Sequence, residues 1–220
     1  ELRDYNVESP GDDEVSIKVE CFGLNFADVL ARRGLYQDCP KLPCVIGYDV
    51  AGTVLESGSN ADEFKVGDRV VALTRFGGYA QSATTMKEGV AKIPKDLPFA
   101  KATVLATQAC TAYYCAYECV QMHSGDKVLV QAAAGGVGTV LVQMAKAKGC
   151  IVYGTASSQK QDYLKEIGVD HPIDYTKADF ASYIKDHSAI GKGLDIVFDS
   201  LGGRPFKKAF KLLAPGGKMV

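Results

Sequence analysis

The stretch that decides the fold runs from Val128-Leu129-Val130 through Ala133-Ala134-Gly135-Gly136-Val137-Gly138 into the apolar segment 139–145. It predicts a strand, a tight glycine turn and a helix. Such a turn aims free backbone N–H groups and the positive end of the helix at one point, which suits a pyrophosphate. A glycine-rich turn that binds no ligand would give the same pattern, so both interpretations stay open at this point.

The turn reads A-x-G-x-x-G, with Ala133 where the usual dinucleotide fingerprint has its first glycine. Gly135 allows a phosphate to approach the backbone closely, and Gly138 lets the helix pack close to the strand. The residues of this turn that we expect to bind a cofactor are Ala134, Gly135, Gly136, Val137 and Gly138.

The segment after the next strand narrows the choice of cofactor. Residues 150–154 complete a β-α-β unit. About 20 residues past the glycine turn, an NAD site would place Asp or Glu on the adenosine ribose. Segment 155–160 has no acidic residue, and its Lys160 is within reach of a 2′-phosphate, although a solvated lysine is the alternative. We therefore expect Ser157 and Lys160 to bind the cofactor, with NADPH favoured over NADH.

Composition excludes two classes of partner. The net charge is −1 and no basic run is interleaved with aromatic residues, which argues against a nucleic-acid partner. The most apolar segment, 128–147, is interrupted by glutamines and glycines, so no integral membrane segment is predicted. The chain shows no secretory signal, and its seven cysteines form no C-x-x-C motif, which favours free thiols and a cytoplasmic location.

Turn signals divide the chain into two predicted domains. Residues 1–97 alternate short β-like runs with Gly, Pro and Asp turns, which predicts a mostly β domain. From residue 98, a helix over 100–122 precedes strands that alternate with helices, which predicts an α/β domain with a doubly wound parallel sheet. Its strands are expected over 127–131, 151–155, 171–174 and 194–199, with a last one starting at Gly217.

Several short motifs follow one another in an order that is more specific than any of them alone. They are Asn25-x-x-Asp28, Arg33-Gly34-Leu35-Tyr36, Gly47-x-Asp49-x-Ala51-Gly52, Val66-Gly67-Asp68-Arg69-Val70, Gly78-Tyr79-Ala80, Thr111-Ala112-Tyr113 and the glycine turn. From near Glu8 to Val220 the chain resembles the zeta-crystallin-like quinone oxidoreductase branch of the medium-chain dehydrogenase/reductases, including the vesicle amine transport protein relatives. The resemblance implies a GroES-like substrate domain over 1–97, a Rossmann NADPH-binding domain over 98–220, and an active site in the cleft between them.

The same resemblance argues against a metal. Where zinc alcohol dehydrogenases of this superfamily carry ligands, the chain has Asn25, Tyr48 and Thr107, and the four-cysteine structural lobe is absent. The sequence therefore predicts no metal site. Without a Lewis acid, a quinone or conjugated enone accepts a hydride more readily than an unactivated ketone.

The resemblance also assigns roles to the remaining candidate residues. Asn25 and Tyr36 are the candidate catalytic residues, which would hydrogen-bond the substrate oxygen; an Asx turn and a packed tyrosine are the alternatives. Thr111 would contact the nicotinamide end, or else bond its own helical turn. Tyr175 matches the family position that joins the lysine at the 2′-phosphate, and Gly202 lies where the carboxyl edge of the sheet faces the ligand.

Together these residues predict a zinc-independent, NADPH-dependent oxidoreductase that transfers a hydride to a small-molecule quinone or conjugated enone. Two alternatives stay open: an NADPH-binding regulatory or scaffold protein with little turnover, and an enoyl reductase module of a larger synthase. By the resemblance, the chain looks truncated at both ends, because it starts after the family's first strand and stops inside the fifth Rossmann strand. The full-length protein is expected to be a homodimer.

Overall fold

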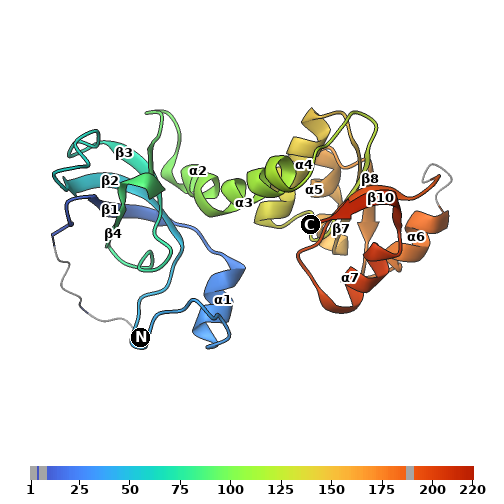
Figure 1. Cartoon of the computed structure of the whole chain (residues 1–220), viewed down its shortest axis with the longest axis horizontal. Helices are drawn as coiled ribbons and strands as arrows, with labels where there is room; N and C mark the ends of the chain where they lie inside the picture. The colour runs from blue at the N-terminus through green and yellow to red at the C-terminus, as the bar shows by residue number, and fades with distance from the viewer. Residues whose placement is uncertain (1–3, 5–8, 187–190) are drawn as a thin grey trace. The chain divides into compact units, whose positions relative to one another are not determined.

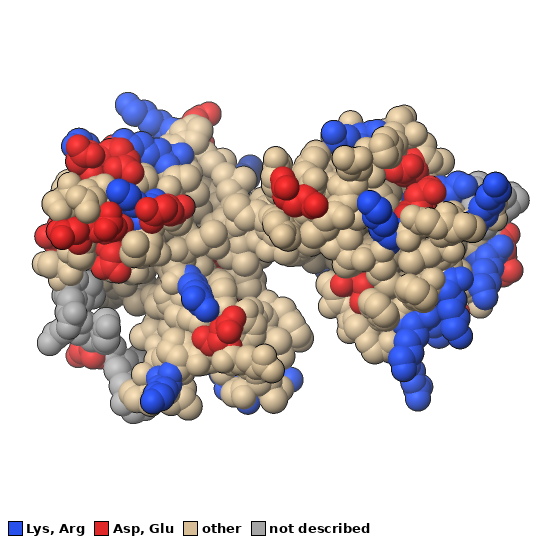
Figure 2. Space-filling view, in the orientation of Figure 1, with Lys and Arg blue, Asp and Glu red and all other residues tan. Residues whose placement is uncertain are grey.

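A computed structural model of the chain describes residue 4, residues 9–186 and residues 191–220 (Figure 1). The chain divides into two compact units, residues 1–108 and residues 109–220, which we call the N-terminal unit and the C-terminal unit. Their charges differ in sign. The N-terminal unit has 12 lysines and arginines against 16 acidic residues, and the C-terminal unit has 13 against 10. Figure 2 shows many of the basic side chains of the C-terminal unit gathered on one side of it.

A five-stranded antiparallel sheet with the strand order β4-β1-β2-β3-β5 forms the N-terminal unit. Its strands are β1 (Glu14–Phe22), β2 (Asp49–Ser57), β3 (Arg69–Leu73), β4 (Ser82–Met86) and β5 (Val90–Lys92), with α1 (Phe26–Arg32) between β1 and β2 and a 3₁₀ turn η1 (Lys87–Gly89) before β5. Two register shifts between β1 and β2 bend and curl the sheet. Its buried side chains, such as Val15, Ile17 and Val70, form one core. The prediction of a mostly β, GroES-like domain is confirmed.

The helix expected over 100–122 is shorter and less regular in the structure. α2 (Phe99–Val104) and α3 (Cys110–Tyr113) alternate with the π-helical turns η2 (Leu105–Ala109) and η3 (Tyr114–Cys119). The helical stretch ends because Val120 has extended backbone, with φ −137° and ψ 163°. Val120 and Met122 are instead buried in the core of the C-terminal unit.

The residues just after the boundary expected at 97/98 pack in the N-terminal unit. Ala102 of α2 and Ala106 of η2 share a hydrophobic cluster with Ala51, Val71 and Ile93 of the sheet region. These small side chains allow close packing, and the two units consequently divide at 108/109. The change of composition at Pro98 predicts where the helix starts. It does not predict in which of the two hydrophobic cores that helix packs.

The C-terminal unit contains a five-stranded parallel sheet with the strand order β10-β9-β6-β7-β8. Its strands are β6 (Lys127–Val130), β7 (Ile151–Ala156), β8 (His171–Asp174), β9 (Leu194–Phe198) and β10 (Leu213–Met219). The last strand begins four residues earlier than the expected start at Gly217. Its pairing with β9 shifts register between Leu213 and Lys218, and the intervening Pro215-Gly216-Gly217 hides the strand because proline and glycine disfavour strand structure.

Helices cover both faces of this sheet. They are α4 (Gly136–Ala147), α5 (Gln161–Glu166) after a 3₁₀ turn η4 (Ser158–Lys160), α6 (Phe180–Asp186) and α7 (Gly203–Phe210). Val128 and Val130 of β6 pack in one core with α4 and α5, whereas Leu129 packs in a second core with α6 and α7. This alternation places α4 and α5 on one face and α6 and α7 on the other (Figure 1). The predicted doubly wound Rossmann sheet is confirmed. No helix in the described part of the chain is long and apolar enough to span a membrane.

Candidate functional site

The glycine turn of the C-terminal unit follows β6 directly and leads into α4. Gln131 donates its backbone N–H to the Phe198 carbonyl at 3.0 Å, and Ala133 donates to the Thr155 carbonyl at 2.9 Å. Ala132 lies between them in the left-handed region, with φ +49°. The sequence suggested that Ala133 replaces the fingerprint's first glycine, yet the position with positive φ is the residue before it, and Ala133 is fully buried.

Gly138 is required by close packing of α4 against the turn. A Cβ atom added there would lie 2.4 Å from the Ala132 carbonyl oxygen and 2.8 Å from the Ala133 Cα. Both are backbone atoms, which cannot swing aside as a side chain can. The contact at Gly135 is looser, since a Cβ there would lie 3.2 Å from the same oxygen.

The start of α4 has the properties of an anion site. Gly135 caps this 12-residue helix, and its first turn contains no acidic side chain. Gly135 and Gly136 are exposed, and Ala134 and Val137 are half-buried, so the unpaired N–H groups of the first turn face solvent. The backbone conformation therefore fits a pyrophosphate, by the helix dipole and the open N–H donors.

This turn lies where the order of the sheet reverses. β6 pairs with β7 on one side and with β9 on the other. The chain runs outward from β6 through β7 to β8, then crosses back to β9 and runs outward to β10 on the opposite side, so the order reverses between β6 and β9. Ligands of such sheets bind outside the carboxyl ends of the strands at that switch point. Gly202, the predicted residue after β9, caps α7 with φ +67°.

Two polar residues that the sequence analysis missed tie the β6 and β9 ends together. Asp199 accepts a hydrogen bond from Gln131 Nε2 at 2.7 Å and another from the Gly202 N–H at 2.8 Å. Gln131 is buried, with 2% of its surface exposed. Both residues directly follow a buried apolar strand, and that shared position was the signal that could have identified them.

Ser157, Lys160 and Tyr175 follow the adjacent ends of β7 and β8. Ala156 pairs with Asp174 in the parallel register, and the Tyr175 N–H donates to the Ala156 carbonyl at 3.2 Å. Ser157 caps η4, and its carbonyl accepts the Lys160 N–H at 3.0 Å. The Lys160 side chain is exposed and Tyr175 is 59% exposed. The structure thus gathers the three predicted residues at one edge of the sheet.

An acidic residue from the neighbouring strand β8 also lies at this edge, which the acid-free segment 155–160 alone did not indicate. Asp174 accepts hydrogen bonds from the hydroxyls of Ser158 and Thr176 and from the Thr176 N–H. Those hydrogen bonds, the Ser158 hydroxyl first, hold the pKa of Asp174 below its usual value. Segment 155–160 itself lacks acids, but the parallel pairing of β7 with β8 brings this carboxylate beside it.

Thr111, the predicted contact for the nicotinamide end, lies in α3 and is exposed. Its carbonyl accepts the Tyr114 N–H within the helical stretch. It belongs to the C-terminal unit, where Ala112 on the neighbouring helix face is fully buried in the core with Val130 and Ala133. Because Ala112 packs into that core, Thr111 lies on the solvent-exposed face of the helix.

The N-terminal unit holds a buried polar cluster around Asp49, the first residue of β2. Asp49 has no exposed surface. Its Oδ1 accepts a hydrogen bond from Asn25 Nδ2 at 3.0 Å, and its Oδ2 accepts one from the Thr107 N–H at 3.3 Å. A Cβ on Gly23 would lie 2.3 Å from Asp49 Oδ1, so a glycine there makes room for the carboxylate. The structure thus brings Asn25, a predicted site residue, and Thr107, which the resemblance places at a ligand-like position, onto one carboxylate.

A second buried carboxylate, Asp28, lies one turn into α1. Its Oδ2 accepts the Asn25 N–H at 2.9 Å and the Tyr79 hydroxyl at 2.9 Å. Its Oδ1 is buried without a hydrogen-bond partner among the described residues. Asn25 therefore contacts both carboxylates, one through its backbone and one through its side chain, and the Asx-turn alternative does not account for the Asp49 contact.

Burial sets the ionisation of this cluster. It raises the pKa of Asp49, and the hydrogen bonds from Thr107 and Asn25 offset part of that rise. Burial also raises the pKa of Tyr79, as does its hydrogen bond to Asp28. Tyr79 therefore remains a protonated hydrogen-bond donor at neutral pH.

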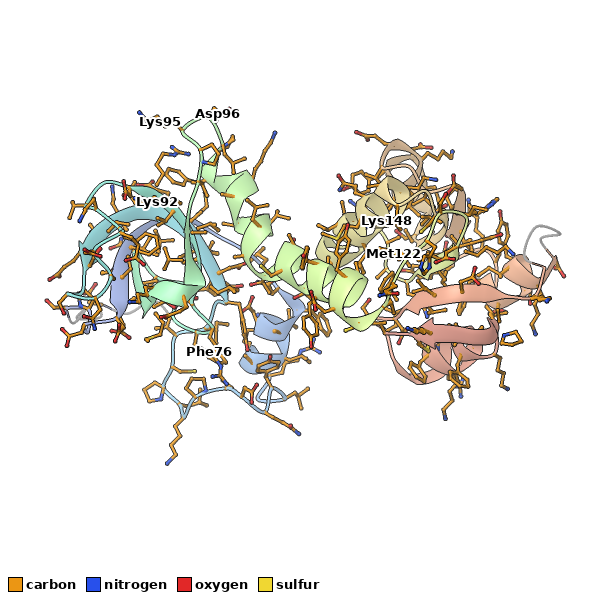
Figure 3. All side chains as sticks on the ribbon, turned by 45° about the horizontal axis from the view of Figure 1, so that its top comes forward. Phe76, Lys92, Lys95, Asp96, Met122 and Lys148 are labelled. Carbon is orange, nitrogen blue, oxygen red and sulfur yellow. The ribbon has the colours of Figure 1, made fainter. Side chains whose placement is uncertain are left out.

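Tyr36 lies in an aromatic group with Tyr48 and Phe76 (Phe76 is labelled in Figure 3). The Tyr36 and Tyr48 rings meet edge to face with centroids 5.9 Å apart. Burial raises the pKa of Tyr48, and a hydrogen bond with Tyr36 contributes to the rise. A surface hollow of about 300 Å³ is lined by Leu35, Tyr36, Gln37 and Asp38. Tyr36 contacts Tyr48, and Asn25 contacts Asp49, which is the next residue in the chain. The two predicted catalytic residues are therefore anchored to neighbouring residues at the start of β2.

The donor set in this cluster does not fit zinc. Structural and catalytic zinc sites use Cys, His and carboxylate ligands. The ligand-like positions carry an amide, a phenol and a threonine, and the Asp49 carboxylate already accepts two hydrogen bonds. Among the described residues, no group of three or more His, Cys, Asp and Glu side chains could hold a metal ion.

A curled antiparallel unit followed by a doubly wound sheet with a glycine turn defines a two-domain dehydrogenase architecture. Family models agree: one described as "Alcohol dehydrogenase GroES-like domain" matches residues 11–95, and one described as "Zinc-binding dehydrogenase" matches residues 136–220. The chain belongs to the medium-chain dehydrogenase/reductase superfamily.

Three relatives illustrate the range of similar proteins. The human "Synaptic vesicle membrane protein VAT-1 homolog" is 40% identical over 213 residues, which are 96% of this chain and 54% of that protein. The Escherichia coli quinone oxidoreductase, solved in complex with NADPH, is 30% identical with a TM-score of 0.92, covering 99% of this chain and 67% of the other. The CurK enoyl reductase is 32% identical with a TM-score of 0.91, covering 99% and 68%. The chain spans about half the length of the curated relatives it matches.

Proposed function

We propose that this chain binds NADPH and that the whole protein is a zinc-independent oxidoreductase that transfers a hydride to a quinone or conjugated enone. The observation that carries the proposal is the open, acid-free N-terminus of α4 at the switch point of the sheet. Similarity to a quinone oxidoreductase solved with NADPH supports the choice of cofactor. The excess of basic residues in the C-terminal unit also favours an anionic ligand.

In this proposal the C-terminal unit binds the cofactor. The backbone of residues 134–138 holds the pyrophosphate, and the Asp199 carboxylate keeps the Gly202 turn in place beside it. Ser157, Lys160 and Tyr175 bind the 2′-phosphate, and Thr111 contacts the nicotinamide end. NADPH, when bound, supplies the hydride.

The N-terminal unit orients the acceptor. Asn25 Nδ2 carries two hydrogens, and one is donated to Asp49 Oδ1, which leaves the second for a substrate oxygen. Tyr36 donates its hydroxyl proton to the same oxygen, or a water does. Donors fixed in advance toward a developing oxyanion lower the barrier without reorganising during the reaction.

The test measures reduction of an enone and of a quinone by Asn25→Ala and Tyr36→Phe variants of the full-length protein. We expect kcat/KM for the enone to fall by up to about a hundredfold to a thousandfold, and for the quinone by less, because a quinone is already electron-poor. NADPH affinity should remain nearly unchanged. Tyr163→Phe, which removes a phenolic hydroxyl group from α5, is the matched control. Enone reduction at the parental rate in both variants would mean that Asn25 and Tyr36 are structural.

A second candidate is the reduction of an enoyl thioester, which the similarity to the CurK enoyl reductase favours. The same assay with an enoyl thioester as acceptor distinguishes the two substrate classes. NADPH binding without turnover of any acceptor would favour a regulatory or scaffold protein. Elemental analysis of the purified protein tests zinc independence, and the expected homodimer and cytoplasmic location remain predictions.

A further inference from the structure

The loop between α1 and β2 carries two thiols in direct contact. Cys39 Sγ and Cys44 Sγ lie 3.8 Å apart. Both are free, half-buried cysteines, and the four residues between them, 40–43, are exposed. Small solutes therefore reach a pair of sulfurs that already touch.

We propose that Cys39 and Cys44 form a reversible intramolecular disulfide when the protein meets a peroxide, which makes this loop a thiol modification site. A disulfide bond is about 2.05 Å long, so the sulfurs must approach by roughly 2 Å. The segment that closes the ring is short and contains Pro40 and Pro43, whose fixed φ angles restrict the separation of its ends. The loop is therefore held near the closed geometry before any bond forms.

The chemistry balances with one peroxide. The Cys39 thiolate attacks an oxygen of hydrogen peroxide, which gives a sulfenic acid and a hydroxide that takes up a proton to become water. The Cys44 sulfur then attacks the Cys39 sulfur, forms the S–S bond and expels the second oxygen as water. The two thiols lose two electrons and two protons, and the peroxide gains them.

The order of attack follows from the surroundings of Cys44. Burial raises the pKa of its thiol, and the neighbouring Cys39 adds to the rise. A thiol kept protonated is a poor first nucleophile. We therefore assign the first attack to Cys39 and the ring-closing attack to Cys44.

Cys150 is less accessible to an oxidant than this pair. Cys150 is buried, its pKa is raised by burial to about 11, and its thiol donates to the His123 carbonyl. Burial also raises the pKa of Cys115. Cys119 is exposed in the C-terminal unit and reports how strongly a given dose of oxidant acts on an accessible thiol.

The disulfide would fix a segment that reaches the candidate site. The Cys39 N–H donates to the Tyr36 carbonyl at 3.1 Å, so the backbone of Cys39 is joined to the residue that lies against Tyr48. The proposal does not depend on the proposed function, because the bond can form whether or not the protein reduces a quinone.

The sequence supplies a direct test, because Lys41 lies between the two cysteines. The reduced full chain is treated with a modest molar excess of hydrogen peroxide, blocked with iodoacetamide in denaturant, and digested with trypsin without reduction. Cleavage after Arg33, Lys41 and Lys65 leaves peptides 34–41 and 42–65, which stay together only if the disulfide has formed.

We expect the linked peptides to account for most of the chains in the parent and in Cys119→Ser, to separate on addition of dithiothreitol, and to be absent from Cys39→Ser and Cys44→Ser. If a dose of peroxide that oxidises half of Cys119 leaves peptides 34–41 and 42–65 separate in the parent, the proposal is wrong. It is equally wrong if the linkage joins two chains, which a doubled mass on a non-reducing gel would reveal.

Discussion

The two units build their candidate sites by different means. In the C-terminal unit the glycine turn offers backbone N–H groups, and its shape depends on which residues lack a Cβ. In the N-terminal unit the cluster joins three distant segments through the side chain of Asp49, which accepts hydrogen bonds from the Asn25 side chain and from the Thr107 N–H. A site formed by backbone groups of one short segment can be recognised from a local sequence motif. A site that joins residues distant in the sequence forms only after the chain has folded.

Lys160, the lysine assigned to the 2′-phosphate site of the C-terminal unit, provides the strongest test of this contrast. Lys160→Ala should weaken NADPH binding by about tenfold to a hundredfold, because a charge-assisted contact to a phosphate contributes roughly 1.5 to 3 kcal/mol. NADH affinity should change little. Titration of nicotinamide fluorescence with both cofactors measures it. Lys165→Ala, an exposed lysine of α5 that pairs with Asp162, is the control. Equal NADPH and NADH affinities in the parent would remove the argument for a 2′-phosphate site.

Gly138→Ala tests whether backbone shape alone controls the turn. The added Cβ meets the Ala132 oxygen at 2.4 Å, and overpacking of this kind costs about 1 to 3 kcal/mol. We expect a lower urea midpoint together with weaker NADPH binding. Gly135→Ala, whose Cβ would have one contact at 3.2 Å, should lose less stability. Similar losses in the two variants would show that the contact with Ala132 does not limit the turn.

The buried carboxylate of Asp49 in the N-terminal unit and the carboxylate of Asp170 in the C-terminal unit should affect protein stability with opposite dependence on pH. Burial raises the pKa of Asp49 above its ordinary value of 3.8, so the folded state binds the proton more tightly and stability falls as pH rises above about 4. Burial by itself would raise the pKa of Asp170 too, but the hydrogen bonds from Lys146 and the Val152 N–H lower it by more, and the net pKa lies below 3.8. The stability that the Asp170 carboxylate contributes is therefore lost as pH falls below about 4.

Urea unfolding between pH 3 and 7 measures both, with Asp49→Asn and Asp170→Asn compared with the parent at each pH. Relative to the parent, Asp49→Asn should gain stability as pH rises through the window above 4. Asp170→Asn should lose relative to the parent as pH rises through the window below 4, by less, since its carboxylate is 36% exposed. Parallel pH profiles for the two variants would contradict the assignment.

The fold could be predicted from the sequence because its signals are local. The run Val128 to Val130 and the glycines after it define a strand, a turn and a helix within a few residues, and the prediction of a parallel sheet is confirmed. The register of β10 and the end of the helix at Cys119 could not be predicted, since Pro215 obscures one strand and burial of Val120 ends the helix.

The site could be predicted only in pieces. Asn25 carried a family pattern, but its contact with Asp49 spans 24 residues and depends on how β1 and β2 pair. Asp174 was missed for the same reason, because only the parallel pairing of two strands puts it beside Ser158. The roles of Asn25, Tyr36, Thr111 and the cofactor residues stay predictions until the assays above are done.

Ala132 has a consequence for how the turn meets its ligand. An alanine in the left-handed region is held at a cost of about 1 kcal/mol that a glycine would avoid. A glycine would also leave the chain freer before folding and the loop looser after it. With alanine, the conformational entropy of the turn is lost during folding and not during binding. The turn is thus preorganised: the protein gives up a little stability so that a ligand need not order the loop that holds it.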